Sequence, residues 1–96
     1  MQYSRRVRKD GWTTWEVEHI AAHGVTPQEV EEVLLPPYRM ERLDADVQAL
    51  WGQTLAGRFL FVLVTESIRG QGLFVVTARD MEANEVSRYR RARRGR

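Results

Sequence analysis

Five polar side chains in this sequence are of the types that phosphodiester chemistry requires, and they come from separate segments: His23, Arg58, Arg79, Glu85 and Tyr89. RNA cleavage through attack of a 2′-hydroxyl group needs proton transfer and stabilisation of negative charge on the phosphate. Arginine supplies positive charge, while histidine, glutamate or tyrosine moves or positions the proton. Each residue also has a structural alternative. His23 would cap its helix, Arg79 would pair with Glu85, and Tyr89 would be a core residue.

The charge of the chain is divided unevenly along its length. The net charge is only +2, but four basic residues lie before residue 10 and six arginines lie from Arg88 to Arg96. Residues 10–87 carry 5 basic and 13 acidic residues. Arginine-rich ends bind nucleic acid phosphates or an acidic protein partner, and they also occur as solvated termini. Arg88, Arg90 and Arg91 in the C-terminal run are therefore candidate RNA-binding residues, and Arg58 at the start of a predicted strand is a fourth.

Composition excludes several other classes of site. The chain has no cysteine, which rules out disulfides and thiolate zinc sites and is compatible with a reducing cytosol. His19 and His23 have the spacing of a zinc pair on a helix, but no third ligand is evident. Without a glycine-rich phosphate loop or a dinucleotide motif, we expect no metal and no cofactor. The longest apolar run is too short to cross a membrane and no signal peptide is visible, so the sequence predicts a cytoplasmic protein.

Two short helices are the first elements that must position these side chains. Thr13 and Glu16 form a capping-box pattern, which predicts a first helix over about 13–23. Thr26 and Glu29 repeat the pattern and predict a second helix over about 27–35. His23 then lies in the junction between the two helices.

The rest of the chain has the pattern of a sheet followed by one more helix. Strands are predicted over 38–43, 47–54, 58–65 and 73–78, with a hairpin turn at 55–57 and a flexible turn at 69–72. Asp80 is the expected cap of a C-terminal helix over about 81–92, which carries Glu85 and Tyr89 four residues apart on one face. The sequence predicts a single α+β domain over 1–96, with an antiparallel sheet of three to four strands and a folded core at about 12–91.

Three segments, taken together and in this order, resemble the BrnT family of bacterial type II toxin–antitoxin toxins. They are HIAAHGVTPQEVEEVL at 19–34, WGQTLAGRFLFVLV at 51–64 and VVTARDMEANEVSRY at 75–89. The shared features are a histidine-glycine-valine helix junction, a glycine-arginine hairpin entering an apolar strand, and a strand that ends in Thr-Ala-Arg before a helix with Glu-x-x-x-Tyr. The resemblance covers about 12–91 of this chain.

The resemblance implies a fold similar to RelE-type ribonucleases, an endoribonuclease activity that inhibits translation, and a cognate antitoxin that binds the toxin and operator DNA. It also implies that His23, Arg79, Glu85 and Tyr89 are the catalytic residues, with Arg58 at the glycine-arginine turn. The family often has lysine and arginine at two positions where this chain has Ala22 and Leu73. A second interpretation is therefore a non-catalytic, toxin-like domain that binds nucleic acid or a protein partner.

Overall fold

The two capping boxes begin the two helices that the sequence predicts. The structure, a computed structural model, describes residues 6–7, 11–66 and 72–94. Helix α1 spans Thr14–Ala21 and helix α2 spans Pro27–Val33, and each follows a threonine N-cap with both arms of the capping box present. Between the helices Gly24 has a φ of 71°, a conformation that favours glycine.

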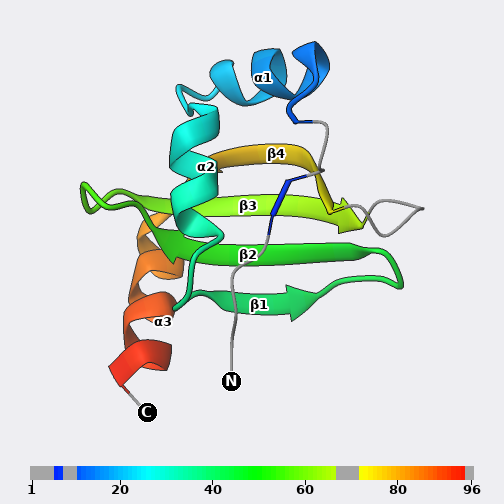
Figure 1. Cartoon of the computed structure of the whole chain (residues 1–96). Coiled ribbons are helices and arrows are strands. Elements are labelled where there is room, and N and C mark those ends of the chain that lie inside the picture. Colours follow the sequence, from blue (N-terminus) through cyan, green and yellow to red (C-terminus); the bar gives the residue numbers. More distant parts are fainter. Residues whose placement is uncertain (1–5, 8–10, 67–71, 95–96) are drawn as a thin grey trace.

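The four strands form one antiparallel sheet in which neighbours in space follow the order of the chain. Strand β1 spans Arg39–Arg42, β2 Val47–Gln53, β3 Phe59–Glu66 and β4 Leu73–Asp80, and the sheet order is β1-β2-β3-β4. Helix α3 spans Ala83–Arg94. Figure 1 shows α2 across one face of the sheet and α1 beside the β4 edge. The structure confirms the predicted α+β class and the order of its elements.

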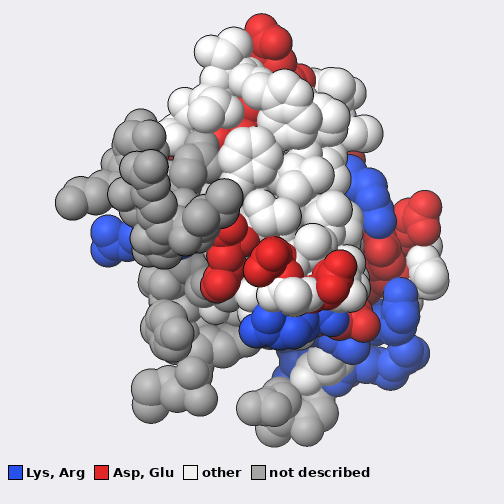
Figure 2. Space-filling view, turned by 90° about the vertical axis from the view of Figure 1, so that its right-hand side faces the viewer, with Lys and Arg blue, Asp and Glu red and all other residues white. Residues whose placement is uncertain are grey.

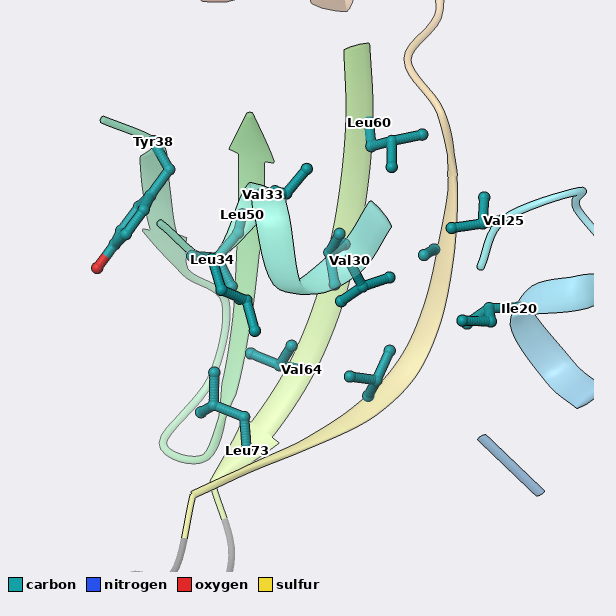
Figure 3. Close-up of a cluster of buried hydrophobic side chains, with 13 residues drawn as sticks. Ile20, Val25, Val30, Val33, Leu34, Tyr38, Leu50, Leu60, Val64 and Leu73 are labelled. Carbon is teal, nitrogen blue, oxygen red and sulfur yellow. The ribbon is translucent and has the colours of Figure 1, made fainter. Parts of the chain in front are cut away.

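The hydrophobic core lies between the helices α1 and α2 and the sheet face that they cover, here called the α2 face. Val30 and Val33 of α2 are buried in one cluster with Leu50 of β2 and Val64 of β3 (Figure 3). Gly52 lets β2 approach α2 closely, because a Cβ atom there would lie 2.9 Å from Val33 Cγ1. Burial of these apolar side chains is the main source of stability.

A buried carboxylate connects α1 to the sheet. Glu16 is fully buried, and its Oε1 atom accepts a hydrogen bond from the Thr13 amide at 2.9 Å. Its Oε2 atom accepts a hydrogen bond from the Val75 amide of β4 at 2.7 Å, beside the register shift between β3 and β4. Glu16 therefore completes the predicted capping box and also satisfies a buried strand amide.

The junction between β4 and α3 differs from the sequence prediction. Asp80 does not cap the last helix, because it is the final residue of β4 and its carboxylate accepts hydrogen bonds from Arg58. At the start of α3 the Glu85 carboxylate instead accepts a hydrogen bond from the Glu82 amide at 2.8 Å. The helix continues to Arg94, past the predicted end at 92, with arginines in its last turn that favour a helix C-terminus. The predicted turn at 69–72 lies mostly outside the described residues.

Candidate functional site

Arg79 and Glu85 form a two-armed ion pair between β4 and α3. Arg79 Nη1 donates to Glu85 Oε1 at 2.8 Å, and Nη2 donates to Oε2 at 3.1 Å. The Arg79 guanidinium also lies over the Phe61 ring, with its central carbon 4.4 Å from the ring centroid. Because α3 holds Glu85 and β3 holds Phe61, the position of Arg79 is fixed from two sides.

This ion pair keeps both groups charged at neutral pH. The hydrogen bonds from Arg79 lower the pKa of Glu85 to about 2, against the opposing effect of burial. In turn, the hydrogen bonds to Glu85 raise the pKa of Arg79. Glu85 is consequently ionised at neutral pH and cannot donate a proton there.

Four side chains form a row straight across the sheet on the face opposite α2. The strand pairing places Arg39 opposite Trp51, Trp51 opposite Phe61, and Phe61 opposite Arg79. The rings of Trp51 and Phe61 are 5.5 Å apart, and Arg39 lies 5.9 Å from the Trp51 ring centroid. We call Arg39, Trp51, Phe61 and Arg79 the cross-strand row, and the sheet face that carries it the α3 face. In this row two aromatic rings lie between two arginines.

A small recess adjoins the cross-strand row where α3 begins to cover the sheet. It is lined by Arg39, Glu41, Trp51, Glu85, Arg88 and Tyr89. Tyr89 is only 2% exposed, and its hydroxyl group is buried without a hydrogen-bond partner among the described residues. An unsatisfied buried hydroxyl group is uncommon in folded proteins, because its desolvation is not compensated.

A second hollow, here called the groove, is also lined by Tyr89. Its lining consists of Gln53, Phe59, Tyr89, Arg90, Arg93 and Arg94. Arg90 lies over the Phe59 ring at 5.0 Å, and Arg93 lies over the Tyr89 ring at 5.9 Å. Arg91 is exposed and lines neither the recess nor the groove. The groove thus presents three arginines beside two aromatic rings.

Arg58 belongs to a different cluster on the α2 face. Its Nε atom donates to Asp80 Oδ1 at 2.7 Å, and its Nη1 atom donates to the Gly24 carbonyl at 2.9 Å and to Glu29 at 3.1 Å. These contacts raise the pKa of Arg58 and lower the pKa of Asp80. For Glu29, the hydrogen bond from the Thr26 amide is the first cause of a lowered pKa, and Arg58 adds to it. The guanidinium of Arg58 is occupied by protein groups.

His23 lies in the turn between α1 and α2, which Arg58 contacts from the α2 face, whereas Arg79 belongs to the α3 face. His23 is an exposed residue of the turn that Arg58 holds through the Gly24 carbonyl, and Arg58 reaches that turn from the α2 face. The Arg79 side chain points to the α3 face. Arg79 and Asp80 are successive residues of β4, so their side chains point to opposite faces, and Asp80 binds Arg58 on the α2 face. The structure therefore brings Arg79, Glu85 and Tyr89 together and places His23 with Arg58.

The remaining polar groups do not form a metal centre in the part of the chain that the structure describes. There, no three side chains of histidine, aspartate or glutamate are grouped to hold a metal ion. The His19 ring stacks on the Trp15 ring at 4.5 Å. Among the described helices, none has both the length and the apolar composition that crossing a membrane requires.

Charged side chains occupy separate areas of the surface. In Figure 2 basic side chains gather at the lower right, and acidic side chains lie above them. The exposed arginines of α3 are Arg88, Arg90, Arg91, Arg93 and Arg94. Clustered positive charge of this kind attracts anionic ligands over distances longer than a hydrogen bond.

The sequence prediction did not include Arg39, Glu41, Trp51 or Phe61 in the site. Trp51 and Phe61 are equally distant from the predicted hairpin turn at 55–57, so the hairpin register would have placed them opposite each other. Comparison of the chain with protein-family models, with curated proteins and with solved structures found no match. The geometry of the α3 face is therefore the basis for a functional conclusion.

Proposed function

We propose that this protein is the toxin of a bacterial type II toxin–antitoxin system, and that it binds single-stranded RNA on its α3 face and cleaves it without a metal ion. The observation that carries the proposal is the cross-strand row beside the recess. Exposed aromatic rings stack on unpaired bases, and arginines contact the phosphates between them. The row supplies both kinds of group from the paired strands of one sheet.

The arginines of this face differ in their availability to phosphate. Arg39 and Arg88 line the recess and have no hydrogen bond or ion pair within the described chain. Arg79 is already paired with Glu85, so a phosphate must compete with a carboxylate for its guanidinium. We therefore assign Arg39 and Arg88 to binding, and Arg79 to the phosphate that reacts.

Competition between phosphate and Glu85 for Arg79 would also make Glu85 available as the proton acceptor of the proposed cleavage. When a phosphate takes the place of Glu85 on Arg79, the carboxylate loses the contact that lowers its pKa. Glu85 can then accept the proton of the attacking 2′-hydroxyl group while Arg79 stabilises the charge on phosphorus. Attack forms a 2′,3′-cyclic phosphate and expels the 5′-oxygen, which takes up a proton from Tyr89 or water. His23 has no part in this scheme, since it belongs to the turn that Arg58 contacts from the α2 face and Arg79 points to the α3 face.

A cognate antitoxin is the expected protein partner under this proposal. The groove offers Arg90, Arg93 and Arg94 on one side of α3, with the rings of Phe59 and Tyr89 between them. An acidic segment of the antitoxin that occupied the groove would cover part of the RNA surface and neutralise its charge. Binding of the antitoxin and of RNA would then be mutually exclusive.

Binding of RNA without cleavage is a second candidate function. The specific observation in its favour is the strength of the pair between Arg79 and Glu85, in which the two charges cancel and the pKa of Glu85 lies at about 2. If phosphate cannot displace Glu85, the face still binds RNA through Arg39, Arg88 and the aromatic rings. The protein would then act by occupying RNA.

One pair of assays separates these functions. Expression of the wild-type protein in a bacterial host should arrest growth, Arg79→Ala should relieve the arrest, and Arg42→Ala should not. Arg42 is an exposed arginine of β1 whose side chain donates a hydrogen bond only to the Ala45 carbonyl among the described residues. Arg42→Ala therefore removes the same charge as Arg79→Ala, but at a position outside the α3 face. In vitro, labelled RNA should yield fragments with 2′,3′-cyclic phosphate ends in the presence of EDTA. Binding without fragments would favour the second function, and absence of binding would exclude both.

A further inference from the structure

The recess contains a carboxylate that the proposed binding of phosphates does not explain. Glu41 of β1 lines the recess together with two arginines, Arg39 and Arg88. It has no hydrogen bond or ion pair with any described residue, in contrast to Glu85, which is occupied by Arg79 and by the Glu82 amide. A free carboxylate repels phosphate, so its presence in an RNA-binding surface points to a ligand group that donates hydrogen bonds.

The other walls of the recess define what kind of group that is. Trp51 provides a flat ring, Arg39 and Arg88 provide hydrogen-bond donors, and the buried Tyr89 hydroxyl group lacks a partner in the described chain. A ligand that satisfies this set must be flat and must carry donors on one edge and acceptors on another. Nucleobases of single-stranded RNA have this character, since they stack on aromatic side chains and are read along their edges.

Only guanine among the four RNA bases presents two adjacent donors to a carboxylate. Its N1–H and N2–H groups point in the same direction and match the two oxygens of one carboxylate group. Its O6 and N7 atoms are acceptors that match an arginine. Adenine and cytosine each offer a single amino group next to an acceptor, and uracil offers one N–H group between two carbonyl groups.

From this complementarity we infer that the recess is a guanine subsite, in which Glu41 binds the N1–H and N2–H groups, Trp51 stacks on the ring, and Arg39 or Arg88 binds O6 and N7. The inference rests on the proposed function, because it names the base that this RNA surface selects. The subsite adjoins the pair of Arg79 and Glu85, which also borders the recess through Glu85. A bound guanine therefore places a neighbouring phosphate close to Arg79.

Fluorescence anisotropy with nine-nucleotide, fully 2′-O-methylated RNA tests the inference, because such RNA cannot be cleaved through its 2′-oxygen. The probes are oligouridine and the same strand with a central guanine, adenine or hypoxanthine base. We expect guanine to bind about tenfold more tightly than adenine or uracil, within the range of a two-armed base contact. Hypoxanthine lacks the N2 amino group and should fall between guanine and adenine.

Two variants assign the preference to Glu41. Glu41→Gln should remove most of the preference for guanine and should retain the affinity for oligouridine, because an amide offers one acceptor in place of two. Glu18→Gln is the matched control, since Glu18 is an exposed carboxylate of α1 outside the recess, and it should bind all four strands as the wild type does. Equal affinity of the wild type for guanine and adenine strands, or a guanine preference that survives Glu41→Gln, would overturn the guanine subsite alone. Failure to bind any of the strands, including oligouridine, would overturn the proposed function and the subsite with it.

Discussion

Arg58 and Arg79 are each paired with a carboxylate near the same end of the sheet, yet they serve opposite faces of it. Arg58 bonds to β4, to α2 and to the turn between α1 and α2, so its guanidinium holds three segments together. Arg79 bonds to Glu85 of α3 and to a backbone carbonyl, and otherwise lies flat on Phe61. The same pair of residue types thus fixes the fold on the α2 face and borders an accessible surface on the α3 face.

The contrast extends to the side chains around each arginine. On the α2 face, Leu60 and Val62 of β3 are fully buried in the core. On the α3 face, the alternate residues Phe59 and Phe61 of the same strand are only half-buried. Stability and the proposed RNA binding are therefore carried by opposite faces, and single substitutions should separate them.

The largest effect on stability should come from Arg58→Ala. This change leaves Glu29, Asp80 and the Gly24 carbonyl without their shared donor, and we expect a loss of about 2–3 kcal/mol in the free energy of unfolding. Urea denaturation measures it, and Arg42→Ala should shift the midpoint little. RNA affinity of the folded Arg58→Ala protein should be unchanged. A loss of RNA affinity equal to that of Arg79→Ala would contradict the division between the two faces.

Acid should weaken the ion pairs of Arg79 and of Arg58, because both depend on ionised carboxylates. Replacing one carboxylate at a time should show how much each pair contributes to the free energy of unfolding. A carboxylate whose pKa is lower in the folded state stabilises the protein above its unfolded pKa, and this contribution is lost as the pH falls through the folded pKa. For Glu85 the loss runs from about 4.5 down to about 2. We expect Glu85→Gln to make stability less dependent on pH in this window, by about 3 kcal/mol at most.

Asp80→Asn provides the corresponding measurement for the α2 face, since the pKa of Asp80 is also lowered. Thermal denaturation from pH 6 to pH 2 gives the dependence for each variant. A pH dependence identical to that of the wild type in Glu85→Gln would mean that the pair on the α3 face adds nothing to stability.

Changes to the free arginines of the α3 face should alter RNA binding with little effect on stability. The double variant Arg39→Ala/Arg88→Ala removes two candidate phosphate contacts. For single-stranded RNA the salt dependence of log K should then become less steep by about 1.4 units. A titration of oligouridine over 50–300 mM salt measures the slope, and the urea midpoint serves as the control. An unchanged slope would place the phosphates elsewhere on the protein.

The smallest effect is expected at a helix cap on the α2 face. Thr26→Ala removes the hydroxyl oxygen that accepts a hydrogen bond from the Glu29 amide, and it should lower the free energy of unfolding by about 1 kcal/mol. Thr14→Ala is the comparison, because Thr14 is exposed in α1 and has no side-chain hydrogen bond within the described residues. The urea midpoint of Thr26→Ala should be clearly lower than that of Thr14→Ala. Equal midpoints would show that this cap does not stabilise the protein.

The elements of the fold were predictable because local patterns determine them. Threonine and glutamate three residues apart begin both N-terminal helices, and the strand predicted at 58–65 from its continuous apolar run is β3, Phe59–Glu66. The prediction of Asp80 as a helix cap was wrong because a distant residue, Arg58, competes for its carboxylate. No local pattern reports a partner that is 22 residues away along the chain.

The candidate site was only partly predictable for a related reason. Glu85 and Tyr89 lie on one helix, so their proximity follows from helical spacing. The position of His23 depends on which sheet face the two N-terminal helices cover, and the sequence did not determine that face. Trp51 and Phe61 could have been paired from the hairpin, whereas the addition of Arg39 and Arg79 to the row required the register of all four strands.

The cross-strand row also has a consequence for how the protein acquires its surface during synthesis. Each of its four members comes from a different strand, and a one-residue slip in any pairing would turn a side chain to the other face. The row therefore cannot exist in a partly folded chain, and it is complete only after β4 has emerged and paired with β3. A nascent chain on the ribosome would lack the proposed RNA-binding surface until β4 had been translated and had paired with β3.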